Sequence, residues 1–98
     1  MKKHRLLKMT IVDQNMLVKA LCDQQKREEA GRVELQCLAE KTLHAGKRLY
    51  LDDREFQCAA LSLNGMRSAY LSAGRSSAGI DRLLLKLLNS RQKHLPAR

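Results

Sequence analysis

The chain has 98 residues, enough for one domain with a modest core. It has no Trp, one Phe, two Tyr and one Pro, and this scarcity of aromatic residues disfavours a β-rich fold. No apolar run approaches the roughly 20 residues of a membrane span, and the basic start is not followed by the apolar core of a signal peptide. We therefore expect a cytoplasmic, all-α protein.

The formal net charge of +9 is concentrated at the two ends of the sequence. Residues 1–12 contain four Lys or Arg and no acid, whereas residues 13–55 contain eight bases and nine acids. Residues 56–98 contain seven bases and the single acid Asp81. A balanced middle between basic ends favours a polyanionic or acidic partner.

These charges suggest a division of the chain into three segments. We expect a basic N-terminal arm at residues 1–9, a single helical domain at residues 10–90 and a basic C-terminal tail at residues 91–98. The arm contains three candidate binding residues, Lys2, Lys3 and Arg5.

The first helix is predicted to begin near Thr10, since Thr10 and Asp13 have the spacing of a capping box. Two structures fit residues 13–44: one long helix, or two helices broken at Gly31. A glycine costs about 1 kcal/mol inside a helix, which a long helix tolerates, and no Pro reinforces a break. We favour the single long helix.

A helix of this length spans about 45 Å and would extend beyond a small core. Its apolar seam includes four leucines, Leu17, Leu21, Leu35 and Leu38. A second copy or another protein would have to cover the excess. The seam is therefore predicted to be a dimer or partner face, with a homodimer as the expected assembly.

The second helix has the clearest start. Asp52 and Glu55 form a predicted capping box, flanked by the hydrophobic staple residues Leu51 and Phe56. An alternative divides this helix at Asn64-Gly65, as the turn of a helix-turn-helix over residues 56–75 in which Arg67 would face nucleic acid.

The third helix follows a short connection and has a leucine-rich stripe from Ile80 to Leu88 at helical spacing. On the opposite face Arg82, Lys86 and Lys93 fall within roughly 40° of one another, and Arg75 would extend the line. Such a stripe can follow a nucleic-acid backbone. The alternative is a solvated outer face.

Catalytic and metal-binding patterns find little support in the sequence. The three cysteines form no Cys-x-x-Cys unit, and the three histidines lie at no metal-ligand spacing from them. Neighbouring carboxylates at 28–29 and 52–53 point about 100° apart on a helix, so neither pair converges on one reacting atom. We predict a protein that is not an enzyme and has neither a metal nor a cofactor.

The sequence therefore favours an all-α helical hairpin or small bundle, with a long first helix and two shorter ones. Its predicted function is regulation by binding, through contacts of the third helix and the basic ends with nucleic-acid phosphates. The alternative function is a helical adaptor or chaperone that docks an acidic protein partner.

Overall fold

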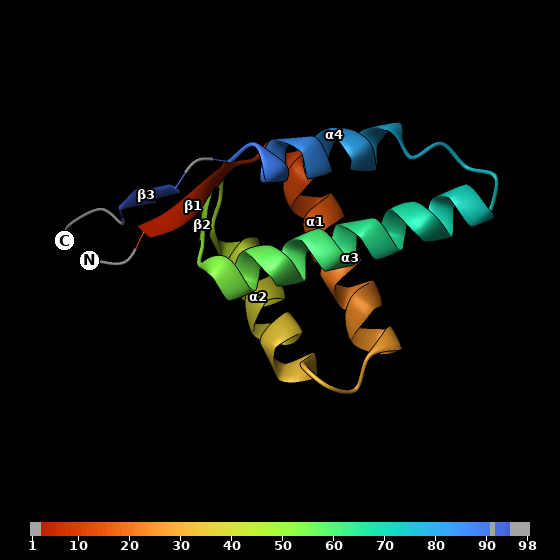
Figure 1. Ribbon diagram of the computed structural model, residues 1–98, viewed down its shortest axis with the longest axis horizontal. Helices are drawn as coiled ribbons and strands as arrows, with labels where there is room; N and C mark the ends of the chain where they lie inside the picture. Colours follow the sequence, from red (N-terminus) through yellow and green to blue (C-terminus); the bar gives the residue numbers. More distant parts are fainter. Residues whose placement is uncertain (1–2, 91, 95–98) are drawn as a thin grey trace.

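The computed structural model describes residues 3–90 and 92–94 and is mostly helical, with one small sheet (Figure 1). The helices are α1 (Ile11–Arg27), α2 (Arg32–His44), α3 (Asp53–Ser72) and α4 (Ala78–Leu88). The strands are β1 (Lys3–Lys8), β2 (Arg48–Leu51) and β3 (Gln92–His94), which form an antiparallel sheet in the order β2-β1-β3. The α1–α2 hairpin crosses the long helix α3, and the sheet lies at one end of the molecule (Figure 1).

The sheet corrects the all-α prediction. Lys3–Lys8 and Gln92–His94, predicted to belong to a basic arm and a basic tail, are strands β1 and β3. Their pairing joins residues about 90 positions apart in the sequence. Strand formation here depends on such long-range partners and on packing, which a local charge pattern does not reveal.

The single long helix predicted for residues 13–44 is wrong. Helix α1 ends at Arg27, and α2 begins after Gly31, which has the left-handed φ of 77°. The break folds α2 back along α1 and places apolar residues of both helices in one core. Burial of a leucine stabilises by about 1.5–3 kcal/mol, so several buried leucines outweigh the loss of helical continuity.

Both predicted capping boxes are confirmed. The Thr10 hydroxyl accepts from the Asp13 N–H at 3.1 Å, and the Asp13 carboxylate accepts from the Thr10 N–H at 3.0 Å. At the start of α3 the Asp52 carboxylate accepts from the Glu55 N–H at 2.7 Å, and the Glu55 carboxylate accepts from the Asp52 N–H at 2.9 Å. These boxes satisfy N–H groups that the first turn of a helix leaves unpaired.

Helix α3 runs without a break through Asn64 and Gly65, so the undivided second helix is confirmed and the alternative helix-turn-helix does not form. Gly65 is explained by packing against α1 instead. A Cβ atom at this position would collide with the side chain of Arg27 and touch that of Gln24. The glycine therefore allows α1 to approach α3 closely.

The core draws on every helix and on strands β1 and β2. Ile80, Leu83 and Leu87 of α4 are buried as the stripe predicted, whereas Leu88 is exposed. In the described part of the chain, no helix is long and apolar enough to cross a bilayer.

Candidate functional site

The sheet brings the two basic ends of the sequence together. Strand β1 is central, with β3 on one side and β2 on the other. In the register of the sheet, His4 lies opposite Lys93, and Lys8 lies opposite Arg48. The cationic residues that the sequence separates thus share one small surface.

One face of this sheet belongs to the core. Leu7, Leu49 and Leu51 are buried there, and Arg5 lies on the same face because side chains alternate along a strand. The Arg5 guanidinium carbon lies 4.2 Å from the centroid of the Phe56 ring, and Nη1 donates to the Ser90 carbonyl at 3.0 Å. Arg5 was predicted to bind a partner; in the structure its contacts tie β1 to α3 and to the segment after α4.

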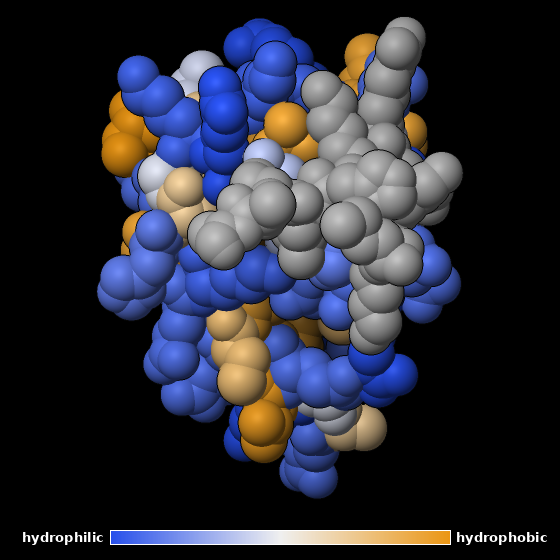
Figure 2. Space-filling model, turned by 90° about the vertical axis from the view of Figure 1, so that its left-hand side faces the viewer, coloured by the Kyte–Doolittle hydropathy of each residue, from blue (hydrophilic) through white to orange (hydrophobic). Residues whose placement is uncertain are grey.

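The opposite face of the sheet consists of cationic, apolar and aromatic side chains. We call its described residues the basic sheet face: His4, Leu6, Lys8, Arg48 and Tyr50. Lys8 and Arg48 are exposed and lie directly opposite each other. Neither forms an ion pair with any residue that the structure describes. Figure 2 views the molecule from the end at which the strands lie, and most of the coloured surface there is hydrophilic.

Like charges at directly opposite positions on two strands destabilise a sheet. The strand register fixes the backbones of Lys8 and Arg48 side by side, so the two exposed side chains start from neighbouring positions on one face. An anion placed between them would relieve this repulsion. The basic sheet face therefore has the electrostatics of an anion-binding surface.

A cleft of about 490 Å³ opens beside the basic sheet face, between β2 and the end of α2. Its lining residues are His4, Lys41, His44, Ala45, Arg48, Leu49 and Tyr50. The Lys41 ammonium donates to both Glu55 oxygens, at 2.9 and 3.0 Å, which neutralises it. His44 Nδ1 donates to the Glu40 carbonyl at 2.8 Å, which leaves Nε2 as the other polar atom of its ring.

The helical residues predicted to bind nucleic acid do not form the expected stripe. Helix α4 ends at Leu88, so Lys93 is on β3 and not on the face of Arg82 and Lys86. The Lys86 ammonium pairs with the Asp13 carboxylate at 2.6 Å. Arg82 is exposed and forms no ion pair with the described residues.

The other predicted cations also have contacts within the chain. The Arg67 guanidinium pairs with the Asp81 carboxylate at 2.6 Å, and that of Arg75 stacks 4.3 Å from the Tyr70 ring centroid. The hydrogen bond from Arg67, with another from Ser77, lowers the pKa of Asp81. Lys2 lies outside the described residues, and Lys3 is the first residue of β1.

The predicted dimer or partner face is inside the molecule. Leu17, Leu21, Leu35 and Leu38 are all buried, because the break at Gly31 folds them against one another and against α3. They are part of the chain's own core. The predicted homodimer depended on these leucines being exposed, and in the structure they are buried.

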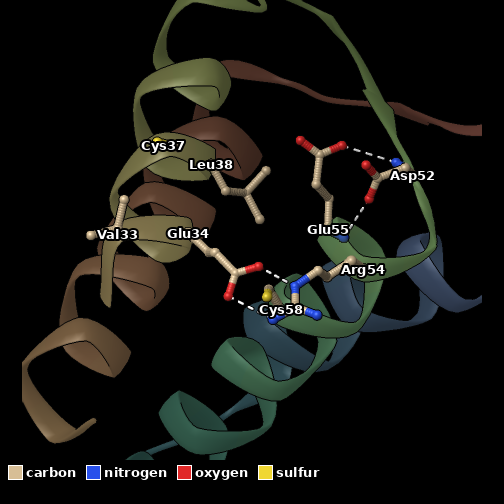
Figure 3. A pocket seen from close by; sticks show the side chains of 8 residues that line it. All are labelled: Val33, Glu34, Cys37, Leu38, Asp52, Arg54, Glu55 and Cys58. Carbon is tan, nitrogen blue, oxygen red and sulfur yellow. Dashed lines mark hydrogen bonds and ion pairs between the residues drawn. The ribbon is translucent and has the colours of Figure 1, made fainter. Parts of the chain in front are cut away.

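A second concave surface lies between α2 and the start of α3 (Figure 3). This α2–α3 groove has a volume of about 260 Å³ and is lined by Val33, Glu34, Cys37, Leu38, Asp52, Arg54, Glu55 and Cys58. Val33 is 73% exposed. Arg54 of α3 reaches across to Glu34 of α2, with Nη2 donating to Oε1 at 2.7 Å (Figure 3).

The charges of the α2–α3 groove are mostly acidic. The hydrogen bond from Arg54 lowers the pKa of Glu34, and burial raises the pKa of the Cys58 thiol, with the nearby Glu34 charge adding to that effect. Glu34, Asp52 and Glu55 outnumber the one cation in the lining. The α2–α3 groove therefore does not suit an acidic partner.

Among the described residues, no three His, Cys, Asp or Glu side chains come together to hold a metal ion. Comparisons with protein-family models, curated proteins and solved structures found no match to this chain. The candidate site therefore rests on the geometry and charge of the chain's own residues.

Sequence reasoning missed Lys8, Arg48 and Tyr50. One signal was available at 48–51, where leucines alternate with Arg48 and Tyr50 as in a half-buried strand, whereas residues 3–8 show no such alternation. Each segment is short, and the first was interpreted by its charge alone.

Proposed function

We propose that this protein is a non-enzymatic, cytoplasmic regulator that binds the nucleic-acid backbone through the basic sheet face. The observation that supports this best is the juxtaposition of Lys8 and Arg48 on neighbouring strands, with no carboxylate paired to either in the described structure. The phosphates of a polyanion would supply the negative charges that Lys8 and Arg48 lack.

The strand register also suits an extended polyanion rather than a single ion. In the register of the sheet, Lys8 on β1 lies opposite Arg48 on β2, and the position of Lys93 on β3 lies opposite that of His4 on β1. A nucleic-acid backbone carries a phosphate every few ångströms and binds chiefly through such contacts. Lys86 of α4 and Arg67 of α3 fit this role less well, because both are already paired with carboxylates.

Single alanine substitutions test the proposal. Arg48→Ala is expected to weaken binding of a labelled oligonucleotide by roughly five-fold at low salt, since one phosphate contact is lost. Arg32→Ala is the matched control, because Arg32 is equally exposed, lies at the far end of α2 and forms no ion pair with the described residues. Fluorescence anisotropy measures both; equal losses would contradict the proposal.

The second candidate function is a protein adaptor, and the α2–α3 groove favours it. Val33 and Cys37 are exposed beside buried Leu38, which resembles a groove that receives an amphipathic helix. Given its acidic lining, the groove would receive an apolar helix with basic flanks.

A photo-crosslinker placed on Cys37 distinguishes the adaptor function. The control carries the same crosslinker on Cys22, which is exposed on α1. A purified partner labelled from Cys37 but not from Cys22 would support docking in the groove. Equal labelling from both positions, or none, would contradict it.

A further inference from the structure

We propose that the cleft beside β2 receives one nucleotide of a single strand, with its base against the Tyr50 ring and its phosphate beside Arg48. This inference rests on the proposed function and names its substrate class as single-stranded nucleic acid. Two features of the cleft carry it: its lining and the outer edge of β2, which pairs with no other strand that the structure describes.

The lining of the cleft matches the parts of a nucleotide. Its volume of about 490 Å³ falls within the usual range of small-molecule sites. Tyr50 supplies an aromatic ring, on which any base can stack. Arg48 supplies donors for phosphate, while the Lys41 ammonium is held by Glu55.

The free edge of β2 adds hydrogen-bonding groups. The Met9 N–H donates to the Lys47 carbonyl at 2.8 Å, which extends the β1–β2 register by one hydrogen-bonded pair. In an antiparallel sheet such pairs alternate with non-bonded ones. The backbone N–H and C=O groups of Arg48 and Tyr50 therefore point away from β1, toward the outer edge of β2.

Those backbone groups can donate to and accept from the edge of a base. They lie on two residues that line the cleft, one of which is the aromatic residue itself. A base inside a duplex is stacked and paired, so it can neither lie on Tyr50 nor offer its Watson–Crick edge to β2. The arrangement therefore favours a single strand, whose bases are free to turn out.

Tyrosine fluorescence tests the stacking directly. The chain has two Tyr and no Trp, so the Tyr70→Phe variant leaves Tyr50 as its sole tyrosine. The phenylalanine ring in this variant still offers a stacking surface to Arg75, which lies over Tyr70 in the native chain. We expect a single-stranded oligothymidylate to quench the remaining emission and a duplex of the same charge to leave it nearly unchanged. Equal quenching by both, or no quenching by a single strand that binds, would overturn the inference.

Affinity measurements separate this inference from the proposed function. Tyr50→Leu is expected to weaken single-strand binding by about ten-fold and duplex binding by less than about two-fold, while Tyr50→Phe retains single-strand affinity. Circular dichroism checks that each variant folds. If wild-type protein binds neither nucleic acid at low salt, the proposed function fails. If it binds both and Tyr50→Leu changes neither affinity, or both equally, only the nucleotide site fails.

Discussion

Two surfaces of this molecule carry exposed cations, and they differ in what those cations touch. On the helical surface Arg67 pairs with Asp81 and Lys86 with Asp13, whereas Arg82 forms no ion pair with the described residues. On the basic sheet face Lys8 and Arg48 oppose each other and have no carboxylate partner in the described structure. The difference teaches that the number of cations in a segment says less about binding than whether the fold already neutralises them.

The largest effect expected from this comparison is on binding. Reversal of both sheet charges, Lys8→Glu with Arg48→Glu, is expected to weaken nucleic-acid binding about 100-fold, since two phosphate contacts become repulsive. Arg82→Glu with Lys86→Glu changes the net charge equally on α4 and is the matched control. Anisotropy titrations at one salt concentration compare them. Equal losses in the two double variants would remove the distinction between the surfaces.

The helical side of the comparison depends on the break at Gly31. Gly31→Ala is expected to destabilise the protein by about 1 kcal/mol, because alanine is strained at a φ of 77°. A continuous helix would instead be stabilised by about 1 kcal/mol by the same change. The sign of the change in unfolding free energy therefore distinguishes the broken helix from the continuous one. Urea unfolding measures it. Gly31→Asn, which tolerates the left-handed region better, serves as control and should lose less.

Single charge reversals should have opposite effects on stability at the two surfaces. Lys8→Glu creates an opposite-charge pair with Arg48 and is expected to stabilise the protein by roughly 0.5 kcal/mol. Lys86→Glu places a like charge beside Asp13 and is expected to destabilise it by a similar amount. The midpoints of urea unfolding at low salt measure both changes in stability. Destabilisation by Lys8→Glu would show that the sheet charges do not repel each other.

The smallest effect expected is on acid stability. Burial raises the pKa of Asp13, but hydrogen bonds from Lys86 and Thr10 outweigh it and lower the pKa overall. The pKa of Asp81 is also lowered. Carboxylates with lowered pKa values stabilise the fold above their unfolded pKa, and this contribution is lost as the pH falls through the folded values.

Unfolding free energy should therefore decline from about pH 4 downward. Thermal unfolding between neutral and acidic pH measures the decline, and Asp81→Asn should make it shallower. A decline of unchanged steepness in Asp81→Asn would show that the Arg67–Asp81 pair does not contribute to the acid dependence.

The local features of the helices could be predicted from the sequence. The capping boxes at Thr10 and Asp52 depend on residues three positions apart, and the stripe at Ile80 and Leu83 depends on one helical period. Such signals lie within a few residues of one another. For this reason the structures that they predict depend little on contacts elsewhere in the fold.

The candidate site could not be predicted, because it depends on pairings distant in sequence. Nothing near Lys8 indicates that Arg48 lies opposite it, and nothing near Arg67 indicates that Asp81 neutralises it. Gly31 was a local signal, but its outcome depended on the core that Leu17 and Leu35 form together. Burial and pairing across the fold, rather than propensity, decided each of these positions.

The salt dependence of binding tests the central claim most directly. The logarithm of the binding constant for a single-stranded oligonucleotide should fall linearly with the logarithm of salt concentration. In the double variant Lys8→Ala with Arg48→Ala, the magnitude of that slope should decrease by about 1.4, the change expected for two lost contacts with a single strand. An unchanged slope in this variant, or no binding by the wild-type protein at low salt, would contradict the assignment of the basic sheet face as the nucleic-acid interface.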